Sequence, residues 1–134
     1  MDETRIALLR SMGYSEKAIE LISRNANLGE IENPTVTSKH SGTCGDVMIL
    51  YLTLENGIVK DAKYQYVGCA GLQSTGAGLV EMIKGQPLAK IEHITAADII
   101  NYLESIPAAK YECAKIAQNA LHKALENYRE KVSG

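Results

Sequence analysis

The feature that most constrains the fold is the dipeptide Asn56-Gly57, which joins two strand-type segments, 46–54 and 58–67. Both residues tolerate positive φ, so Asn-Gly is typical of a two-residue type I′ hairpin turn. The sequence therefore predicts an antiparallel β-hairpin near the middle of the chain.

The same turn predicts which residues face each other across the hairpin. In a two-residue loop, Glu55 faces Ile58. If the pairing continues without a bulge, Cys44 lies opposite Cys69, with Cβ atoms about 4.5–5.5 Å apart. Two thiols that are remote in sequence would then share the open end of one hairpin.

Helical segments precede and follow the hairpin. Apolar spacing of about 3.6 residues, together with caps such as Ser15 and Thr95, indicates helices. They are predicted over 3–12, 16–25, 70–84, 95–104 and 110–131. The segment 35–43 is rich in β-branched and small residues and is predicted to be an edge strand. The expected fold is α+β: a small antiparallel three-stranded sheet with helices packed on it and a long C-terminal helix.

The composition is that of one ordinary soluble domain, with 134 residues, 46% of them hydrophobic and 22% charged. We expect a single domain over 1–134, with an N-terminal helical segment, 1–33, before a core over 34–131.

No apolar run approaches the ~20 residues of a membrane span, and the charged first residues do not resemble a secretion signal. A formal charge of −2 gives no sign of nucleic-acid binding. We expect a cytoplasmic protein.

Three cysteines, Cys44, Cys69 and Cys113, are the candidates for chemistry. An odd number without a signal peptide favours free thiols in a reducing compartment. Each lies at the boundary of a predicted element, and two lie at helix N-termini, where the helix dipole lowers a thiol pKa. Thiolates select zinc, copper(I) or iron–sulfur clusters, and Asp46, two residues after Cys44 along a predicted strand, could add an oxygen ligand.

Other interpretations of the cysteines remain open. Free cysteines are often small buried core residues, and three of them need not share a site. A thiol enzyme would need a histidine base, for which His40 is the nearest candidate in sequence. His93 and His122 are expected at the surface.

Three strings resemble the iron–sulfur cluster assembly scaffolds of the IscU/NifU type. They are Thr43-Cys44-Gly45-Asp46-Val47-Met48, Val67-Gly68-Cys69-Ala70 and Lys110-Tyr111-Glu112-Cys113. The similarity extends from about residue 33 to residue 128, and the family's fold is IscU/SufE-like. By this resemblance the three cysteines are thiolate ligands, Asp46 is the nearby carboxylate and Lys110 is an auxiliary residue.

Two departures from the family pattern affect what the resemblance implies. The family usually has a histidine directly before the third cysteine, and here Glu112 takes that place, so the fourth ligand is left open between Asp46 and Glu112. The family's chaperone-recognition stretch, Leu-Pro-Pro-Val-Lys, is replaced by the segment from Ile106 to Lys110. A chaperone therefore remains only a possible partner.

The function implied by the resemblance is that of a scaffold rather than an enzyme. Such a protein binds iron, accepts sulfur from a cysteine desulfurase, builds a labile [2Fe–2S] cluster and transfers it to apo-proteins. Cys113 is the expected persulfide acceptor, because a helix-end position would expose and activate it. The alternatives are a zinc-binding sulfur acceptor of the same family and a paralogue that only binds partners.

Overall fold

The computed structural model describes residues 1–133 and confirms the predicted α+β class. Its elements are α1 (Glu3–Met12), α2 (Glu16–Ser23), β1 (Val36–Ser41), β2 (Val47–Glu55), β3 (Ile58–Val67), α3 (Ala70–Ile83), α4 (Leu88–Ile91), α5 (Ala96–Leu103), the 3₁₀ turn η1 (Ala108–Lys110) and α6 (Tyr111–Ser133). All five predicted helices are present. The short elements α4 and η1 were not predicted, because so few residues show no helical period.

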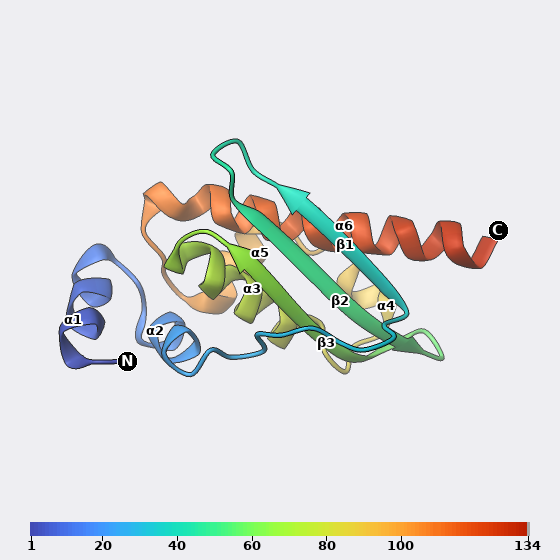
Figure 1. Ribbon diagram of the computed structural model, residues 1–134, viewed down its shortest axis with the longest axis horizontal. Coiled ribbons are helices and arrows are strands. Elements are labelled where there is room, and N and C mark those ends of the chain that lie inside the picture. Colours follow the sequence, from blue (N-terminus) through green and yellow to red (C-terminus); the bar gives the residue numbers. More distant parts are fainter. Residues whose placement is uncertain (134) are drawn as a thin grey trace.

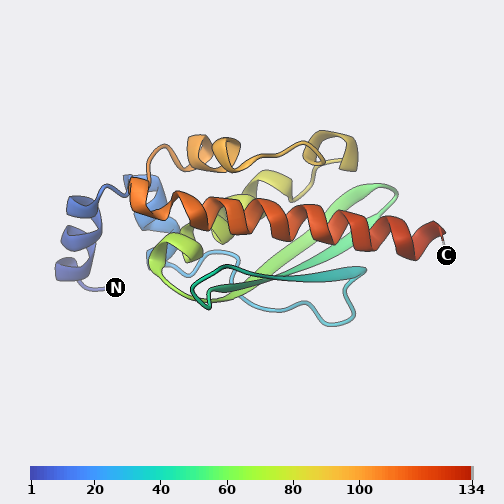
Figure 2. The same cartoon turned by 90° about the horizontal axis from the view of Figure 1, so that it is seen from above.

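The three strands form one antiparallel sheet in the order β1-β2-β3, with β1 at an edge as predicted. Helix α6 lies along β1 and β2, and α3 packs against β3 (Figure 1). Seen from above, α4 and α5 lie on the side of α6 away from the sheet (Figure 2). The long helix is therefore enclosed between the sheet and a second helical layer.

The predicted hairpin is present, but its expected register is wrong. Glu55 pairs with Ile58 and Leu54 with Val59, as expected for a two-residue turn. Lys60 is then an extra residue on β3, and this bulge shifts the remaining pairs by one residue. The ladder ends at Val47 and Val67, before either cysteine, so Cys44 and Cys69 do not face each other across it.

The core lies between the inner face of the sheet and the helices. Its fully buried strand side chains alternate with outward-facing ones, as the pleat requires; they are Met48, Leu50, Leu52, Val59, Ala62 and Tyr64. Helix α3 approaches this face very closely at Gly76, where an added Cβ would lie 2.5 Å from Cδ2 of Tyr64. The absence of a side chain at Gly76 therefore sets the distance between α3 and the sheet.

The N-terminal helices are attached to the loop that follows α5. Ser15 caps α2 as predicted, by accepting a hydrogen bond from the Ala18 amide. The backbone N–H of Ser15 donates to the Ser105 carbonyl at 2.9 Å, and the Ser105 hydroxyl donates to the Gly13 carbonyl at 2.7 Å.

Within residues 1–133, no helix has both the length and the apolar character needed to cross a bilayer.

We predict that Gly76→Ala lowers the free energy of unfolding by about 1–3 kcal/mol, because the new methyl group overpacks against Tyr64. Denaturant unfolding measures this change. In a Tyr64→Leu background the cost should be smaller, since the ring is the obstacle. A stabilising effect of about 1 kcal/mol, as helix propensity alone gives, would show that the packing is not tight.

Candidate metal centre

Two of the three thiols meet where helices α3 and α6 begin. Cys69 is the N-cap residue of α3, and Cys113 lies in the first turn of α6. Their sulfur atoms are 3.7 Å apart, and both thiols are free, as predicted. The hydroxyl of Thr75 in α3 donates to the Cys113 carbonyl at 3.2 Å, which holds the two helix ends together.

This sulfur–sulfur distance fits one metal ion. Tetrahedral zinc binds thiolates at about 2.3 Å, so two thiolates on one such ion are about 3.8 Å apart. The Cys69 and Cys113 sulfurs are already at that separation. The pair can therefore bind one tetrahedral ion with almost no change in its sulfur–sulfur distance.

The two thiols differ in ionisation. Burial disfavours the Cys69 thiolate more than any other single effect, but the N–H groups at the start of α3, the Cys113 thiol and the Lys110 ammonium favour it. Together they hold the pKa of Cys69 below its ordinary value. Burial, followed by the negative charge of Cys69, raises the pKa of Cys113 to about 12. The predicted low thiol pKa is thus confirmed for Cys69 and wrong for Cys113.

The expected exposure of Cys113 is also wrong. Its side chain is buried, with 5% of its surface exposed, whereas Cys69 is half-buried and Cys44 is exposed. Ile116 and Ala117, one turn further along α6, are buried as well, so this face of the helix is turned into the core. A position in the first turn of a helix does not by itself make a side chain accessible.

Cys44 lies apart from the other two thiols and is exposed. It belongs to the turn between β1 and β2, beside the Thr43 hydroxyl, and not to a strand, so the expected strand alternation with Asp46 does not apply. In residues 1–133 no three His, Cys, Asp or Glu side chains are close enough to hold an ion together. The structure therefore provides a preformed pair of thiols and a separate third thiol.

A pocket of about 500 Å³ contains all the predicted site residues. Its lining includes Cys44, Asp46, Cys69, Lys110, Glu112 and Cys113, together with His40 from β1. Asp46 reaches toward the cysteine pair: a Cβ added at Gly68 would lie 3.1 Å from its Oδ1 atom. Carboxylates from the β1–β2 turn and from α6 thus line the same pocket as the thiols.

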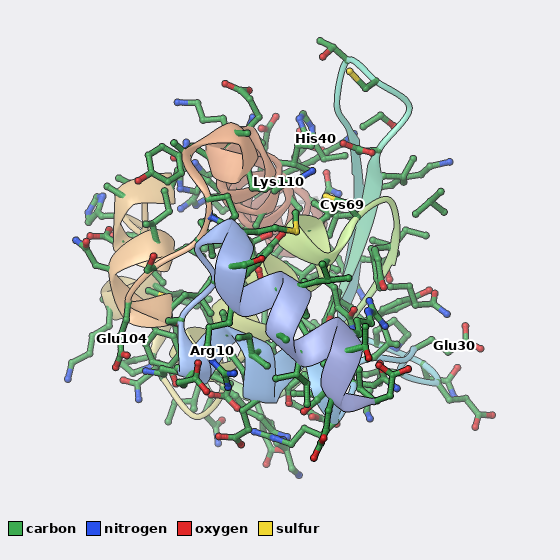
Figure 3. The ribbon with its side chains drawn as sticks, turned by 90° about the vertical axis from the view of Figure 1, so that its left-hand side faces the viewer. Arg10, Glu30, His40, Cys69, Glu104 and Lys110 are labelled. Atoms are coloured by element: carbon green, nitrogen blue, oxygen red, sulfur yellow. The ribbon has the colours of Figure 1, made fainter. Side chains whose placement is uncertain are left out.

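Lys110 lies over the start of α3. A Cβ added at Gly71 would meet the Cβ, Cγ and Cδ atoms of Lys110 at 2.9–3.1 Å, so the missing side chain at Gly71 makes room for the lysine stem. The Lys110 ammonium lowers the pKa of both Cys69 and Cys113. Figure 3 labels Cys69, Lys110 and His40 at this end of the molecule, behind α1.

The histidines are placed largely as expected. His40 lines the pocket, with its Nε2 atom 3.4 Å from Nδ2 of Asn119. His93 is exposed beside Glu92, and the ring of His122 is 3.0 Å from the Ile94 carbonyl. Two features of this region were not predicted: the close approach of Lys110 to Gly71, and the buried hydroxyl of Tyr14, which has no hydrogen-bond partner. Both depend on tertiary packing.

Comparison with known proteins identifies the family of this chain. The model of the NifU-like N terminal domain matches residues 13–133. The chain is 33% identical over 125 residues to the iron-sulfur cluster assembly scaffold protein IscU of Escherichia coli strain K12, covering 90% of this chain and 97% of that protein. It is 32% identical to the iron-sulfur cluster assembly protein IscU of Plasmodium falciparum, covering 89% and 75%.

A solved structure shares the fold. The NifU-like protein (N-terminal) from Brucella abortus superimposes with a TM-score of 0.68 at 15% sequence identity, covering 87% of this chain and 94% of that one. The residues matched by the family model span the positions of all three cysteines. The chain therefore belongs to the NifU-like N-terminal domain family, as its cysteine strings predicted.

Proposed function

We propose that this protein is a scaffold on which iron and sulfide are assembled into a [2Fe–2S] cluster for transfer to apo-proteins. The observation that carries the proposal is the Cys69–Cys113 pair, held at metal-binding separation inside a pocket that Cys44 and Asp46 also line. Relatives at about one-third identity are named as assembly scaffolds, which agrees with a carrier rather than an enzyme.

The candidate ligands suit a cluster that is released to another protein. Clusters that remain in a protein are commonly held by four thiolates, and this chain has three cysteines. A carboxylate oxygen from Asp46 or Glu112 is a harder and weaker partner for the iron of a cluster. Such a mixed site binds the cluster firmly enough to build it and loosely enough to release it.

The ligands divide into two groups by position. Cys69 and Cys113, at the starts of α3 and α6, bind one iron. Cys44 and Asp46 approach from the β1–β2 turn, which is closed by a 2.8 Å hydrogen bond from the Gly42 amide to the Asp46 carbonyl. Binding of the second iron requires this turn to move Cys44 toward the pair.

Sulfur enters through Cys69 rather than Cys113. Cys69 is the more accessible member of the pair, and its thiolate is the more stable one. Its thiolate attacks the outer sulfur of a persulfide on a cysteine desulfurase, so that a new S–S bond forms at Cys69 and the desulfurase cysteine leaves as a thiolate. Lys110 balances the negative charge of this step.

The proposed scaffold function implies further partner proteins. Apo-proteins that need a cluster would receive it at the open pocket. In the segment from Ile106 to Lys110, Ile106 is buried and only the small residues Ala108 and Ala109 are exposed to a chaperone. That surface is small for a specific contact.

Anaerobic reconstitution with iron and sulfide, followed by transfer to an apo-ferredoxin, tests the proposal. The wild-type chain should gain the visible absorption of a [2Fe–2S] cluster and then activate the ferredoxin. Cys69→Ser and Cys113→Ser should each reduce the bound cluster by about tenfold or more, because a ligand is lost outright. Cys44→Ser should also reduce the bound cluster, because its thiol is needed for the second iron, but it should leave the Cys69–Cys113 pair able to bind a single metal ion.

His93→Ala is the matched control, because His93 is exposed outside the pocket and the variant should reconstitute like the wild type. A colourless protein that retains one zinc ion per chain would favour the zinc-binding sulfur acceptor. A chain that binds neither iron nor zinc would contradict both.

Mapping of the persulfide tests the entry route. After incubation with a desulfurase and cysteine, alkylation and mass spectrometry should locate the extra sulfur on Cys69. Because the pKa of Cys69 is lowered, its alkylation rate should fall off at a lower pH than that of an ordinary thiol, while Cys113 should react more slowly than an ordinary thiol. Sulfur transfer that survives Cys69→Ser and is lost in Cys113→Ser would reverse the assignment.

A further inference from the structure

The two outer edges of the sheet are protected in different ways. Backbone segments cover the free edge of β3. Near one end of it, the Gly29 N–H donates to the Tyr64 carbonyl at 2.8 Å. Near the other end, the Val59 N–H donates to the Gln86 carbonyl at 2.9 Å. In residues 1–133, the free edge of β1 has no strand and no bridging backbone segment beside it. A bare edge of this kind is a template on which another chain can pair.

Side chains of α6, which runs along β1, cover this second edge (Figure 1). Residues at every fourth position of α6 donate hydrogen bonds to carbonyls at every second position of the edge. The bonds run from Lys123 to Lys39 at 3.0 Å, from Asn127 to Thr37 at 3.1 Å and from Lys131 to Thr35 at 2.7 Å. Four helical residues and two strand residues both advance about 6–7 Å, so the two spacings match. We call the side chains of Lys123, Asn127 and Lys131 the edge guard.

The edge guard pairs only part of what this edge offers. The N–H and C=O groups of one strand residue point to the same side, so the N–H groups of Thr37 and Lys39 also point away from β2. Within residues 1–133, neither N–H donates to a group outside the ladder. The three bonds of the guard are exposed, and exposed side-chain bonds exchange readily with water. An added strand could therefore replace the guard and also accept bonds from the free N–H groups.

The strand that fits this edge best is β1 of a second copy. Two identical strands pair antiparallel about a two-fold axis, which gives a closed dimer. With the axis at Ser38, Thr37 of each copy faces Lys39 of the other, and the outward N–H and C=O groups of both residues pair. This register keeps the two lysines apart, whereas an axis at Lys39 would place like charges directly opposite each other.

We propose that the edge of β1 is a self-association surface for β1 of a second copy, and that the edge guard holds this surface closed in the single chain. The guard has the advantage because it belongs to the same chain, whereas a second strand must be recruited from solution. Loss of the guard leaves the carbonyls without a competing partner. The inference goes beyond the proposed function and does not depend on the metal centre.

Sedimentation of the full chain over a range of protein concentrations tests the proposal. A chelator and a reductant are present throughout, so that neither a metal cluster nor a disulfide joins two chains. The unguarded variant, Lys123→Ala with Asn127→Ala and Lys131→Ala, should dimerise at least about tenfold more tightly than the wild type, because three competing bonds are lost. The variant also removes two positive charges from a chain of formal charge −2, so repulsion between copies opposes this result.

A proline on the edge shows whether the association uses β1. Thr37→Pro, added to the unguarded variant, removes an outward N–H that pairs with nothing in the chain, so the fold should tolerate it. It should return the unguarded variant to the weak association of the wild type. The matched control is Arg5→Ala with Lys90→Ala and Asn101→Ala, which makes similar changes at exposed positions of α1, α4 and α5. The control should sediment like the wild type.

Three results would overturn the inference. The guard does not close the edge if the unguarded variant associates no more tightly than the wild type. Another surface is responsible if dimers persist after Thr37→Pro, or if the control dimerises as well. Should the unguarded variant melt far below the wild type, Asn127→Ala alone decides, since it removes only the central donor and should give a smaller increase in association. None of these results bears on the proposed function, because all the measurements are made without metal.

Discussion

The close approach of α3 and α6 at their N-terminal ends determines the rest of the site. Both helices pack on the same face of the sheet, and Gly76 lets α3 lie almost in contact with the Tyr64 ring. Gly71 lets the stem of Lys110 cross over the first turn of α3. These two contacts bring Cys69 and Cys113 to 3.7 Å although 44 positions separate them in the sequence.

The two helix ends also create the electrostatic asymmetry of the pair. One thiol receives the unpaired N–H groups of α3 and becomes the better thiolate, while its neighbour is buried and stays protonated. A protonated thiol beside a thiolate avoids two negative charges at one position in the empty protein. In the function we propose, a bound metal ion would supply the positive charge that allows the second thiol to ionise.

The local features of the fold were predicted from the sequence, but the features that depend on tertiary packing were not. Ser15, Asn56-Gly57 and the Thr95–Asp98 capping box are local features, and each occurs as expected. The bulge at Lys60 depends on the twist of the sheet and has no sequence signature, so the predicted facing of Cys44 and Cys69 was wrong. The burial of Cys113 depends on the side of α6 that faces the core, and the orphaned Tyr14 hydroxyl depends on the docking of distant segments.

The proposed function depends on the binding of one metal ion by Cys69 and Cys113 together. X-ray absorption spectroscopy of the protein loaded with one equivalent of zinc measures this directly. We expect at least two sulfur ligands at about 2.3 Å, and the loss of sulfur scattering in a Cys69→Ser, Cys113→Ser double variant. A first shell made only of nitrogen and oxygen at about 2.0–2.2 Å would contradict it.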